Sequence, residues 1–170
     1  MVTRRVLVVG PCGAGKSTLA FALAERWNLP LFHLDKFYWK PGWIESSEEE
    51  RAERIGEVVS REAWLLEGNY GSTLHLRLPR ATRVIYLDYP IPLCLWRIMK
   101  RIRRYGGRTR PDMAEGCEER FDINFMWYVA GWRWGPGKRL ERQLAGHEEK
   151  FLRFSSPRET ERWLTALPTR

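Results

Sequence analysis

Residues 5–19 constrain this chain more than any other stretch, because a short apolar run there leads through a glycine-rich turn into a helical pattern. Their sequence is RVLVVGPCGAGKSTL. Positions 10–17 fit the pattern G-x-x-x-x-G-K-[ST] of a phosphate-binding P-loop, and this pattern requires a strand before it and a helix after it. Both are indicated here, so the stretch predicts a nucleotide-binding loop.

The residue types in this loop suit a triphosphate. Glycines allow backbone N–H groups to approach the phosphates without a Cβ in the way, and the helix N-terminus adds partial positive charge. Lys16 is expected to bridge the β- and γ-phosphates of ATP, and the hydroxyl of Ser17 to ligate Mg²⁺. Positive potential in the loop can lower a thiol pKa at Cys12, but backbone contacts there favour a tolerated small side chain. The predicted nucleotide-binding residues are Gly10, Pro11, Cys12, Gly13, Ala14, Gly15, Lys16, Ser17 and Thr18.

The bulk composition is that of one ordinary domain, predicted to span residues 1–170. The chain has 3 scattered cysteines, which predict neither a disulfide framework nor a zinc site. No N-terminal apolar leader and no long apolar run is present, so we expect a reduced cytoplasmic protein with no membrane contact. A formal net charge of +8 suits nucleic acid, an acidic surface or polyanionic small molecules.

Apolar runs alternate with helical patterns along the chain, which predicts an α/β fold with a parallel sheet. Strands are expected over residues 6–9, 31–34, 63–70, 83–88 and 150–154. Helices are expected over 16–27, 47–61, 91–105, 138–145 and 157–164, with capping boxes opening the second and the last. A further helical pattern is expected to start at Glu118, and the aromatic residues of 121–134 are expected to pack in the core.

Acidic residues lie at or just after the ends of two of the predicted strands, at the edge of a parallel sheet where ligands collect. Asp35 is either a substrate-binding residue there or a helix cap, and Glu67 is expected to hold the water shell of Mg²⁺ or to orient the acceptor. His33 is interpreted as an interior histidine. Arg77 and Arg80 either reach an anionic acceptor or are solvated.

Glycines and arginines come together in residues 105–117, between two helical patterns. A mobile backbone with guanidinium groups suits a lid that closes over a triphosphate. A solvated basic face and a nucleic-acid patch with stacking aromatics are the alternatives, and the P-loop favours the lid.

The chain resembles P-loop kinases of the nucleoside monophosphate kinase group, in particular the adenylate-kinase-like bacterial topology modulation (FlaR-like) proteins. The resemblance rests on residues 10–17, 34–39, 67–70, 78–80 and 107–113. It implies a five-stranded parallel sheet in the order 2-3-1-4-5 with helices on both faces, an acceptor-binding segment at about 35–62 and a short arginine-rich lid at about 105–117. It also implies that the adenine of ATP lies against Arg104 or Arg108 and residues 154–157.

One feature of the sequence departs from that group, and another adds a second resemblance. Residues 67–70 are EGNY, where nucleoside monophosphate kinases carry Asp-Gly-Phe-Pro-Arg, so the arginine that grips the acceptor phosphate is missing from its place. Residues 35–38, DKFY, are similar to the Asp-x-Phe-Tyr of uridine-kinase-like enzymes, in which the aspartate takes a proton from an acceptor hydroxyl. A phosphate acceptor needs no such base.

Three hypotheses follow. The favoured one is an ATP- and Mg²⁺-dependent nucleoside monophosphate kinase; the second is a kinase of a nucleoside or other small hydroxyl compound with Asp35 as general base. The third is an ATP-regulated DNA- or RNA-binding protein, which no sequence motif supports. The expected catalytic residues are Lys16, Asp35, Arg104, Arg108 and Arg110; the expected acceptor-binding residues are Asp35, Tyr38, Glu67, Asn69 and Arg80; the expected metal ligands are Ser17 and Glu67.

Overall fold

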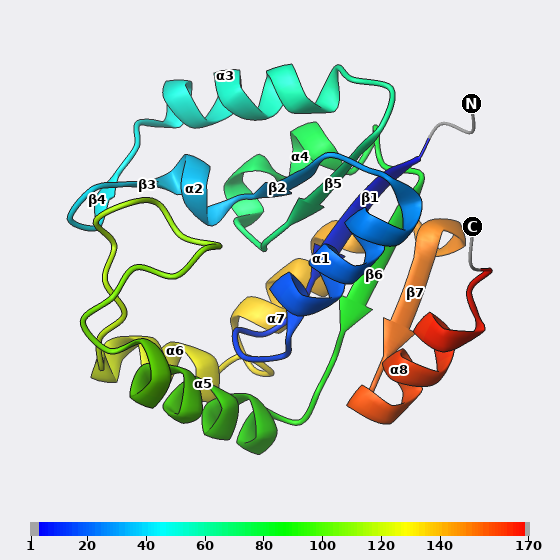
Figure 1. Ribbon diagram of the computed structural model, residues 1–170. Helices are drawn as coiled ribbons and strands as arrows, with labels where there is room; N and C mark the ends of the chain where they lie inside the picture. The colour runs from blue at the N-terminus through cyan, green and yellow to red at the C-terminus, as the bar shows by residue number, and fades with distance from the viewer. Residues whose placement is uncertain (1–3, 169–170) are drawn as a thin grey trace.

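The computed structural model describes residues 4–168, so residues 1–3 and 169–170 of the predicted domain lie outside the described part. Its centre is a parallel sheet of β1 (Arg5–Val9), β2 (Leu31–His33), β5 (Trp64–Glu67), β6 (Arg83–Leu87) and β7 (Phe151–Phe154) (Figure 1). The strand order is β2-β5-β1-β6-β7. In terms of these five strands the order is 2-3-1-4-5, which confirms the predicted fold class and topology.

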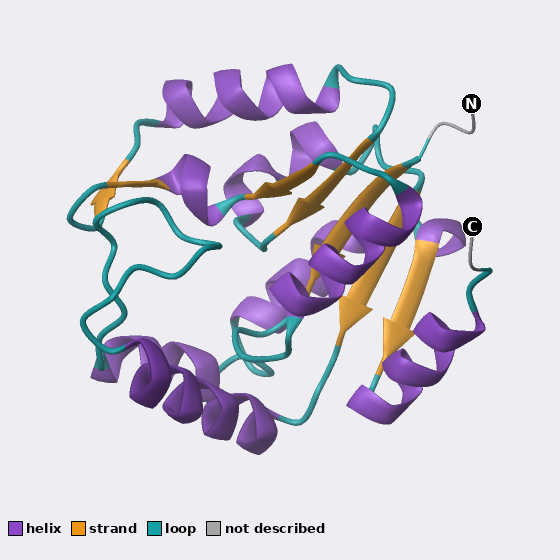
Figure 2. Cartoon of the chain, viewed as in Figure 1, coloured by secondary structure: helices purple, strands orange, loops and turns teal. Residues whose placement is uncertain are grey.

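Helices cover both faces of the sheet (Figure 2). The helices are α1 (Lys16–Trp27), α2 (Asp35–Tyr38), α3 (Glu48–Val59), α4 (Leu74–Arg77), α5 (Ile91–Tyr105), α6 (Ile123–Ala130), α7 (Pro136–Leu144) and α8 (Pro157–Ala166), with short 3₁₀ turns at Gly71–Thr73 and Glu148–Lys150. A hairpin of β3 (Trp39–Lys40) and β4 (Ile44–Glu45) stands apart from the sheet, in a region where the sequence predicted no strand.

The alternation of β1 divides the core into two layers. Leu7 and Val9 are fully buried among residues of α3, α4 and α7, whereas Val6 and Val8 are fully buried among residues of α1 and α5. Apolar side chains on both faces of one strand explain its uninterrupted apolar run. The carboxyl ends of β1, β2 and β5 therefore lie at one edge, which positions the P-loop beside the residues that follow β2 and β5.

The predicted capping boxes are confirmed in one case and corrected in the other. At α3 the Ser47 hydroxyl accepts from the Glu50 N–H and the Glu50 carboxylate accepts from the Ser47 N–H. At α8 the Ser156 hydroxyl accepts from the Glu159 N–H, but the Glu159 carboxylate turns to the N–H of Ser155. The N-terminus of α8 is therefore capped by Ser156 alone, without the reciprocal hydrogen bond of a capping box.

Two expectations for residues 118–134 were wrong. The helix does not start at Glu118; α6 begins at Ile123, where the Asp122 carboxylate accepts from the N–H groups of the first turn. The aromatic residues there are not uniformly core, because Trp132 is 1% exposed while Trp127 and Trp134 are 71% and 78% exposed.

No helix formed by residues 4–168 combines the length and the apolar character that a bilayer span requires.

Candidate active site

The P-loop connects β1 to α1 in a conformation that depends on glycine. Gly13 has φ +83° and Gly15 has φ +97°, in the left-handed region where a Cβ is strained. A Cβ on Gly13 would also lie 2.3 Å from the carbonyl oxygen of Cys94. The loop is therefore packed against α5, which fixes the course of its backbone.

The N-terminus of α1 is open to a ligand. Gly15 is its N-cap and supplies no side-chain cap, so the first N–H groups of the helix have no partner within it. Lys16 is buried and its Nζ donates to the Pro11 carbonyl at 3.2 Å, while Arg97 donates to the Ala14 carbonyl at 2.9 Å. An end of this kind is suited to phosphate oxygens. Thr18 is exposed on the first turn.

Cys12 faces the cavity described below, where its burial raises the pKa of its thiol. The lowered pKa considered from the loop's positive potential is therefore wrong, and the thiol stays protonated at neutral pH.

Ser17 is the meeting point of the P-loop and two acidic side chains. Its hydroxyl lies 3.2 Å from Oε2 of Glu67, which ends β5, and 2.9 Å from Oδ2 of Asp112, which lies in the loop between α5 and α6. The Nδ1 of His33 lies 2.9 Å from the same oxygen of Glu67. This arrangement agrees with the interpretation of His33 as an interior residue.

Asp35 follows β2 and points into the cavity rather than capping a helix. It is the first residue of α2, whose N-cap is Leu34 with no side-chain cap, so the helix-cap alternative is wrong. Its Oδ1 accepts a hydrogen bond of 2.5 Å from the Tyr70 hydroxyl, which in turn accepts from the Trp39 indole at 2.9 Å. Burial, with a smaller contribution from the charge of Glu67, raises the pKa of the Asp35 carboxyl above its usual value.

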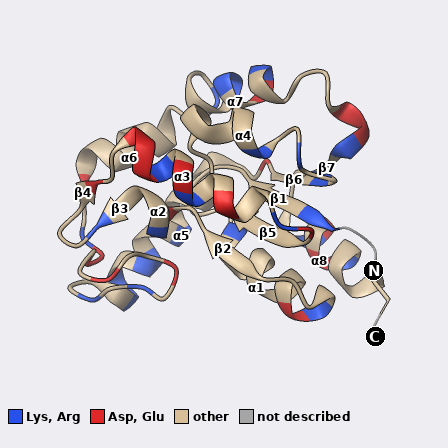
Figure 3. Ribbon diagram, turned by 90° about the horizontal axis from the view of Figure 1, so that it is seen from above, with Lys and Arg blue, Asp and Glu red and all other residues tan. Residues whose placement is uncertain are grey.

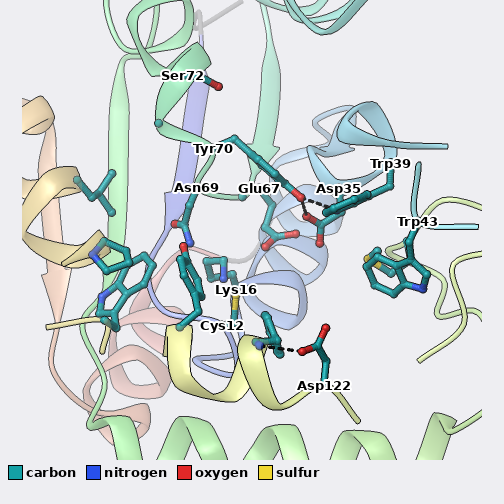
Figure 4. Close-up of a pocket in the computed structure, with 18 of the residues that line it drawn as sticks. Cys12, Lys16, Asp35, Trp39, Trp43, Glu67, Asn69, Tyr70, Ser72 and Asp122 are labelled. Atoms are coloured by element: carbon teal, nitrogen blue, oxygen red, sulfur yellow. Dashed lines mark hydrogen bonds between the residues drawn. The ribbon is translucent and has the colours of Figure 1, made fainter. Parts of the chain in front are cut away.

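These groups open into one cavity of about 1010 Å³ (Figure 4). Lys16, Asp35, Glu67 and Asn69 line it on the sheet side, and aromatic and cationic side chains line much of the rest, together with the acids Glu119 and Asp122. The aromatic and cationic side chains are Trp39, Trp43, Tyr70, Phe125, Tyr128, Trp132, Arg101, Arg110, Arg120 and Arg139. The cavity can thus hold a flat apolar group together with negative charge.

Only part of the predicted arginine set reaches this cavity. Arg110 lines it, and its guanidinium pairs with Asp112 at 2.8 Å and Glu119 at 2.7 Å. Arg104 and Arg108 are exposed and are not among the lining residues, and the guanidinium of Arg104 lies over the Tyr105 ring. Arg101, which the sequence also offered among the arginines around the phosphoryl group, lines the cavity and pairs with Glu119 at 2.9 Å.

Two predicted acceptor-binding residues lie elsewhere. Tyr38 is 3% exposed, stacks on Tyr70 with 3.4 Å between ring centroids and bonds to Thr73 at 2.8 Å, so its role is packing. Arg80 is exposed and donates to the Val59 carbonyl at the end of α3. The chain enters β5 just after α3, so this contact lies near the amino ends of the strands, away from the cavity at their carboxyl ends.

Arg77 is fully buried, whereas the sequence predicted that it either reaches an anionic acceptor or is solvated. It donates to backbone carbonyls of residues 68–70, so it holds the loop after β5.

The loop of residues 106–122 between α5 and α6, which we call the lid loop, contains the predicted lid and contacts the β3–β4 hairpin (Figure 1). The Gly42 N–H donates to the Gly116 carbonyl at 3.1 Å, and the Trp43 indole donates to the Glu118 carbonyl at 3.1 Å. With the Ser17–Asp112 contact, the lid loop joins the P-loop to the predicted acceptor segment.

Arg120, Arg139 and the aromatic wall were missed as site residues. Arg139 lies on α7 and belongs to no local motif, whereas Asp112 falls inside the 107–113 stretch quoted for the resemblance.

Basic residues are not confined to the cavity: Figure 3 shows blue segments in α7 and β7 and in loops on the other side of the view, with red segments between them.

The residues around Ser17 fit Mg²⁺ bound together with a triphosphate. Hydroxyl and carboxylate oxygens are the ligands this ion takes, and it commonly uses one or two carboxylates plus substrate phosphates. Within residues 4–168 no group of three or more His, Cys, Asp or Glu residues forms a metal cage by itself. The phosphates would complete the shell.

Known protein structures share the fold of this chain. No protein-family model and no curated protein matches the sequence. Solved structures do match: a shikimate kinase from Bacteroides thetaiotaomicron has a TM-score of 0.58 at 16% identity, covering 95% of this chain and 94% of that one. The fold is that of the P-loop kinases.

Two further structures agree. A gluconokinase from Sinorhizobium meliloti 1021 has a TM-score of 0.57 at 18% identity, covering 96% of this chain and 92% of that one. A sugar kinase from Janibacter sp. HTCC2649 has a TM-score of 0.52 at 17% identity, covering 96% and 93%. At these identities the likeness concerns the fold, and the finer resemblance to topology modulation proteins gains no support from it.

Proposed function

We propose that this protein is an ATP- and Mg²⁺-dependent phosphotransferase that acts on a hydroxyl group of a small-molecule acceptor. The observation that carries this proposal is the position of Asp35: its carboxylate lines the same cavity as Lys16, beside Glu67, and is not used as a helix cap. The solved structures described as shikimate kinase, gluconokinase and sugar kinase support the assignment to small-molecule kinases.

In the proposed reaction Asp35 takes the proton of the acceptor hydroxyl while that oxygen forms a bond to the γ-phosphorus of ATP. The bond from the γ-phosphorus to the β–γ bridging oxygen breaks, and ADP leaves with the electron pair. A raised carboxyl pKa suits a general base, because proton transfer is most effective when the pKa approaches the working pH.

The cationic side chains of the cavity stabilise the negative charge on the phosphoryl group in the transition state. Lys16 exchanges its contact with the Pro11 carbonyl for phosphate oxygens, and Arg110 faces the same space from the lid loop. Mg²⁺, when bound, would be held by Ser17 and Glu67 and would neutralise part of the charge of the triphosphate. The positions of these groups before the reaction reduce the reorganisation that the transition state requires.

A nucleoside monophosphate kinase is the second candidate, because the aromatic side chains and arginines of the cavity suit a base and a phosphate. Arg120 and Arg139 line the cavity, and neither forms an ion pair within residues 4–168. In that case Asp35 would bind the acceptor rather than take a proton. Nucleic-acid binding has less support, since Arg97, Arg101 and Arg110 are engaged within the site.

The test is a coupled ADP-release assay with ATP and Mg²⁺, run with panels of sugars, hydroxy acids, nucleosides and nucleoside monophosphates. Wild type is compared with Lys16→Ala and Asp35→Asn. Turnover of a hydroxyl acceptor, with kcat reduced about 10²–10⁴-fold in Asp35→Asn, supports the proposal. Turnover of a monophosphate with near-normal kcat in Asp35→Asn supports the second candidate, and unchanged turnover in Lys16→Ala contradicts both.

A further inference from the structure

The lid loop meets the P-loop through Asp112, whose Oδ2 lies 2.9 Å from the Ser17 hydroxyl across 95 residues of sequence. Oε2 of Glu67 lies 3.2 Å from the same hydroxyl. A serine hydroxyl has one hydrogen, so it can donate to only one of these carboxylates at a time. Two carboxylates are therefore directed at one hydroxyl oxygen, and each also has a nitrogen partner: Nδ1 of His33 for Glu67 and the Arg110 guanidinium for Asp112.

Asp112 is held in this position by its own loop. Arg110 pairs with the same Oδ2 at 2.8 Å, and Arg110 is fixed in turn by Glu119, which is 5% exposed. The Met113 N–H closes the turn by donating to the Arg110 carbonyl at 3.1 Å. This ion pair with a guanidinium holds Asp112 as a carboxylate beside the Ser17 hydroxyl.

An anion at this point opposes a bare triphosphate. The phosphates of ATP would lie at the N-terminus of α1, next to Ser17, and would repel both Glu67 and Asp112 unless a cation lay between them. With a divalent cation there, the same two carboxylates become favourable contacts, because carboxylate and hydroxyl oxygens suit Mg²⁺ or the waters that it retains.

We propose that Asp112 is a metal-binding residue carried by the lid loop, which joins Ser17 and Glu67 in the ligand shell of the Mg²⁺ that accompanies ATP. This inference rests on the proposed function, since it requires a nucleotide in the P-loop. Its consequence is that ATP binding beside Asp112 depends on the cation: Mg²⁺ with ATP keeps Asp112 at Ser17, and ATP alone is repelled by its carboxylate.

The test compares ATP binding with Mg²⁺ and with EDTA by titration calorimetry, using a non-hydrolysable ATP analogue. Asp112→Asn keeps the shape of the side chain and removes its charge. We expect it to weaken binding in Mg²⁺ about tenfold or more and to leave binding in EDTA unchanged or tighter, since a carboxylate facing the triphosphate is lost. Glu115→Gln is the matched control, because Glu115 is an exposed acid of the same loop.

A second readout follows the metal directly. Mn²⁺, observed by electron paramagnetic resonance in the presence of the analogue, should bind about tenfold more weakly to Asp112→Asn, with Asp112→Glu retaining part of the affinity and Glu115→Gln all of it. Thermal unfolding of each variant checks that it is folded.

The outcomes separate this inference from the proposed function. Equal tightening of analogue binding by Asp112→Asn in Mg²⁺ and in EDTA would mean that Asp112 only occupies the phosphate site, and would overturn the inference alone. Unchanged Mn²⁺ affinity would overturn it as well. Failure of wild type to bind the analogue under either condition would overturn both the inference and the proposed function.

Discussion

The Asn69 side chain forms two hydrogen bonds with the backbone of Gly10: Nδ2 donates to the Gly10 carbonyl at 2.8 Å, and Oδ1 accepts from the Gly10 N–H at 3.0 Å. Gly10 begins the P-loop, and Asn69 belongs to the loop after β5. An amide pair of this kind fixes the start of the loop in two directions. The sequence predicted Asn69 to bind the acceptor; in the structure it lines the cavity, and its amide is engaged with the P-loop backbone.

Replacement of Asn69 by alanine should loosen the P-loop without touching the acceptor. We expect the free energy of unfolding to fall by about 1–3 kcal/mol, since both polar groups of Gly10 lose their partner, and the Kd for ATP to rise. Chemical denaturation and nucleotide titration measure the two effects. Asn124→Ala, at an exposed position of α6, is the control. Normal ATP affinity in Asn69→Ala would show that the pair has no supporting role.

Gly10 should also be intolerant of a side chain. Its φ is +139°, and a Cβ would lie 2.4 Å from the carbonyl oxygen of Leu87, so Gly10→Ala forces the backbone of β6 or of the loop to move. We expect a loss of more than about 2 kcal/mol of stability. Gly56→Ala in α3, where nothing lies within 4 Å of the new Cβ, should instead stabilise by about 0.5–1 kcal/mol. Equal effects of the two substitutions on the denaturation midpoint would contradict this reasoning.

The fold was predictable because its signals are local. Val6 to Val9 form a strand buried on both faces, and the helix of residues 91–105 ends where the sequence indicates, at Gly106. The failures occur where local pattern and tertiary context conflict. Trp127 and Trp134 carry helical spacing typical of core residues, yet no element packs over them in the described part of the chain, and they remain exposed.

The site was predictable only where chemistry is bound to a motif. Lys16 and Ser17 begin the helix after β1, Asp35 follows β2 and Glu67 ends β5. Lys16, Asp35 and Glu67 line one cavity, and Ser17 contacts Glu67. Arginines give no such signal, because a guanidinium at the end of a long side chain can serve a site, a salt bridge or a buried loop. Arg77 shows the last case, and its burial depends on the fold rather than on its neighbours in sequence.

Asp35→Asn should raise stability while it lowers activity. Burial raises the pKa of the folded carboxyl, so the folded protein holds its proton to a higher pH than the unfolded chain, whose value is about 3.9. Wild type therefore loses stability as pH rises above about 4 until the folded pKa is passed, and the variant does not. Asparagine can still accept from the Tyr70 hydroxyl. Melting temperatures measured from about pH 4 to about pH 8 should diverge in favour of the variant; a difference independent of pH would argue against ionisation of a buried Asp35.

The lid-loop arginines should separate into two groups. Arg110 lines the cavity and pairs with Asp112 and Glu119, so Arg110→Ala should lower kcat by about 10²–10³-fold, as expected for loss of a positioned charge in the transition state. Arg108 is exposed, and Arg108→Ala should change kcat by less than about threefold. Steady-state kinetics of the two variants decides the matter. An equal loss in Arg108→Ala would restore the role that the sequence suggested for it.

Arg77 should be required for stability more than any other arginine described. It is fully buried, and its Nη2 donates to the carbonyls of Asn69 at 2.5 Å and Tyr70 at 2.9 Å. Burial lowers the pKa of its guanidinium to about 10, so it remains a cation at neutral pH. Arg77→Met keeps the apolar volume and leaves those carbonyls without donors, which should cost about 2–4 kcal/mol in chemical denaturation. Because the same loop carries Asn69 and Tyr70, ATP affinity should fall as well. Arg80→Met, at an exposed position nearby, should cost less than about 1 kcal/mol; a similar loss in both variants would mean that the buried contacts of Arg77 do not organise the loop.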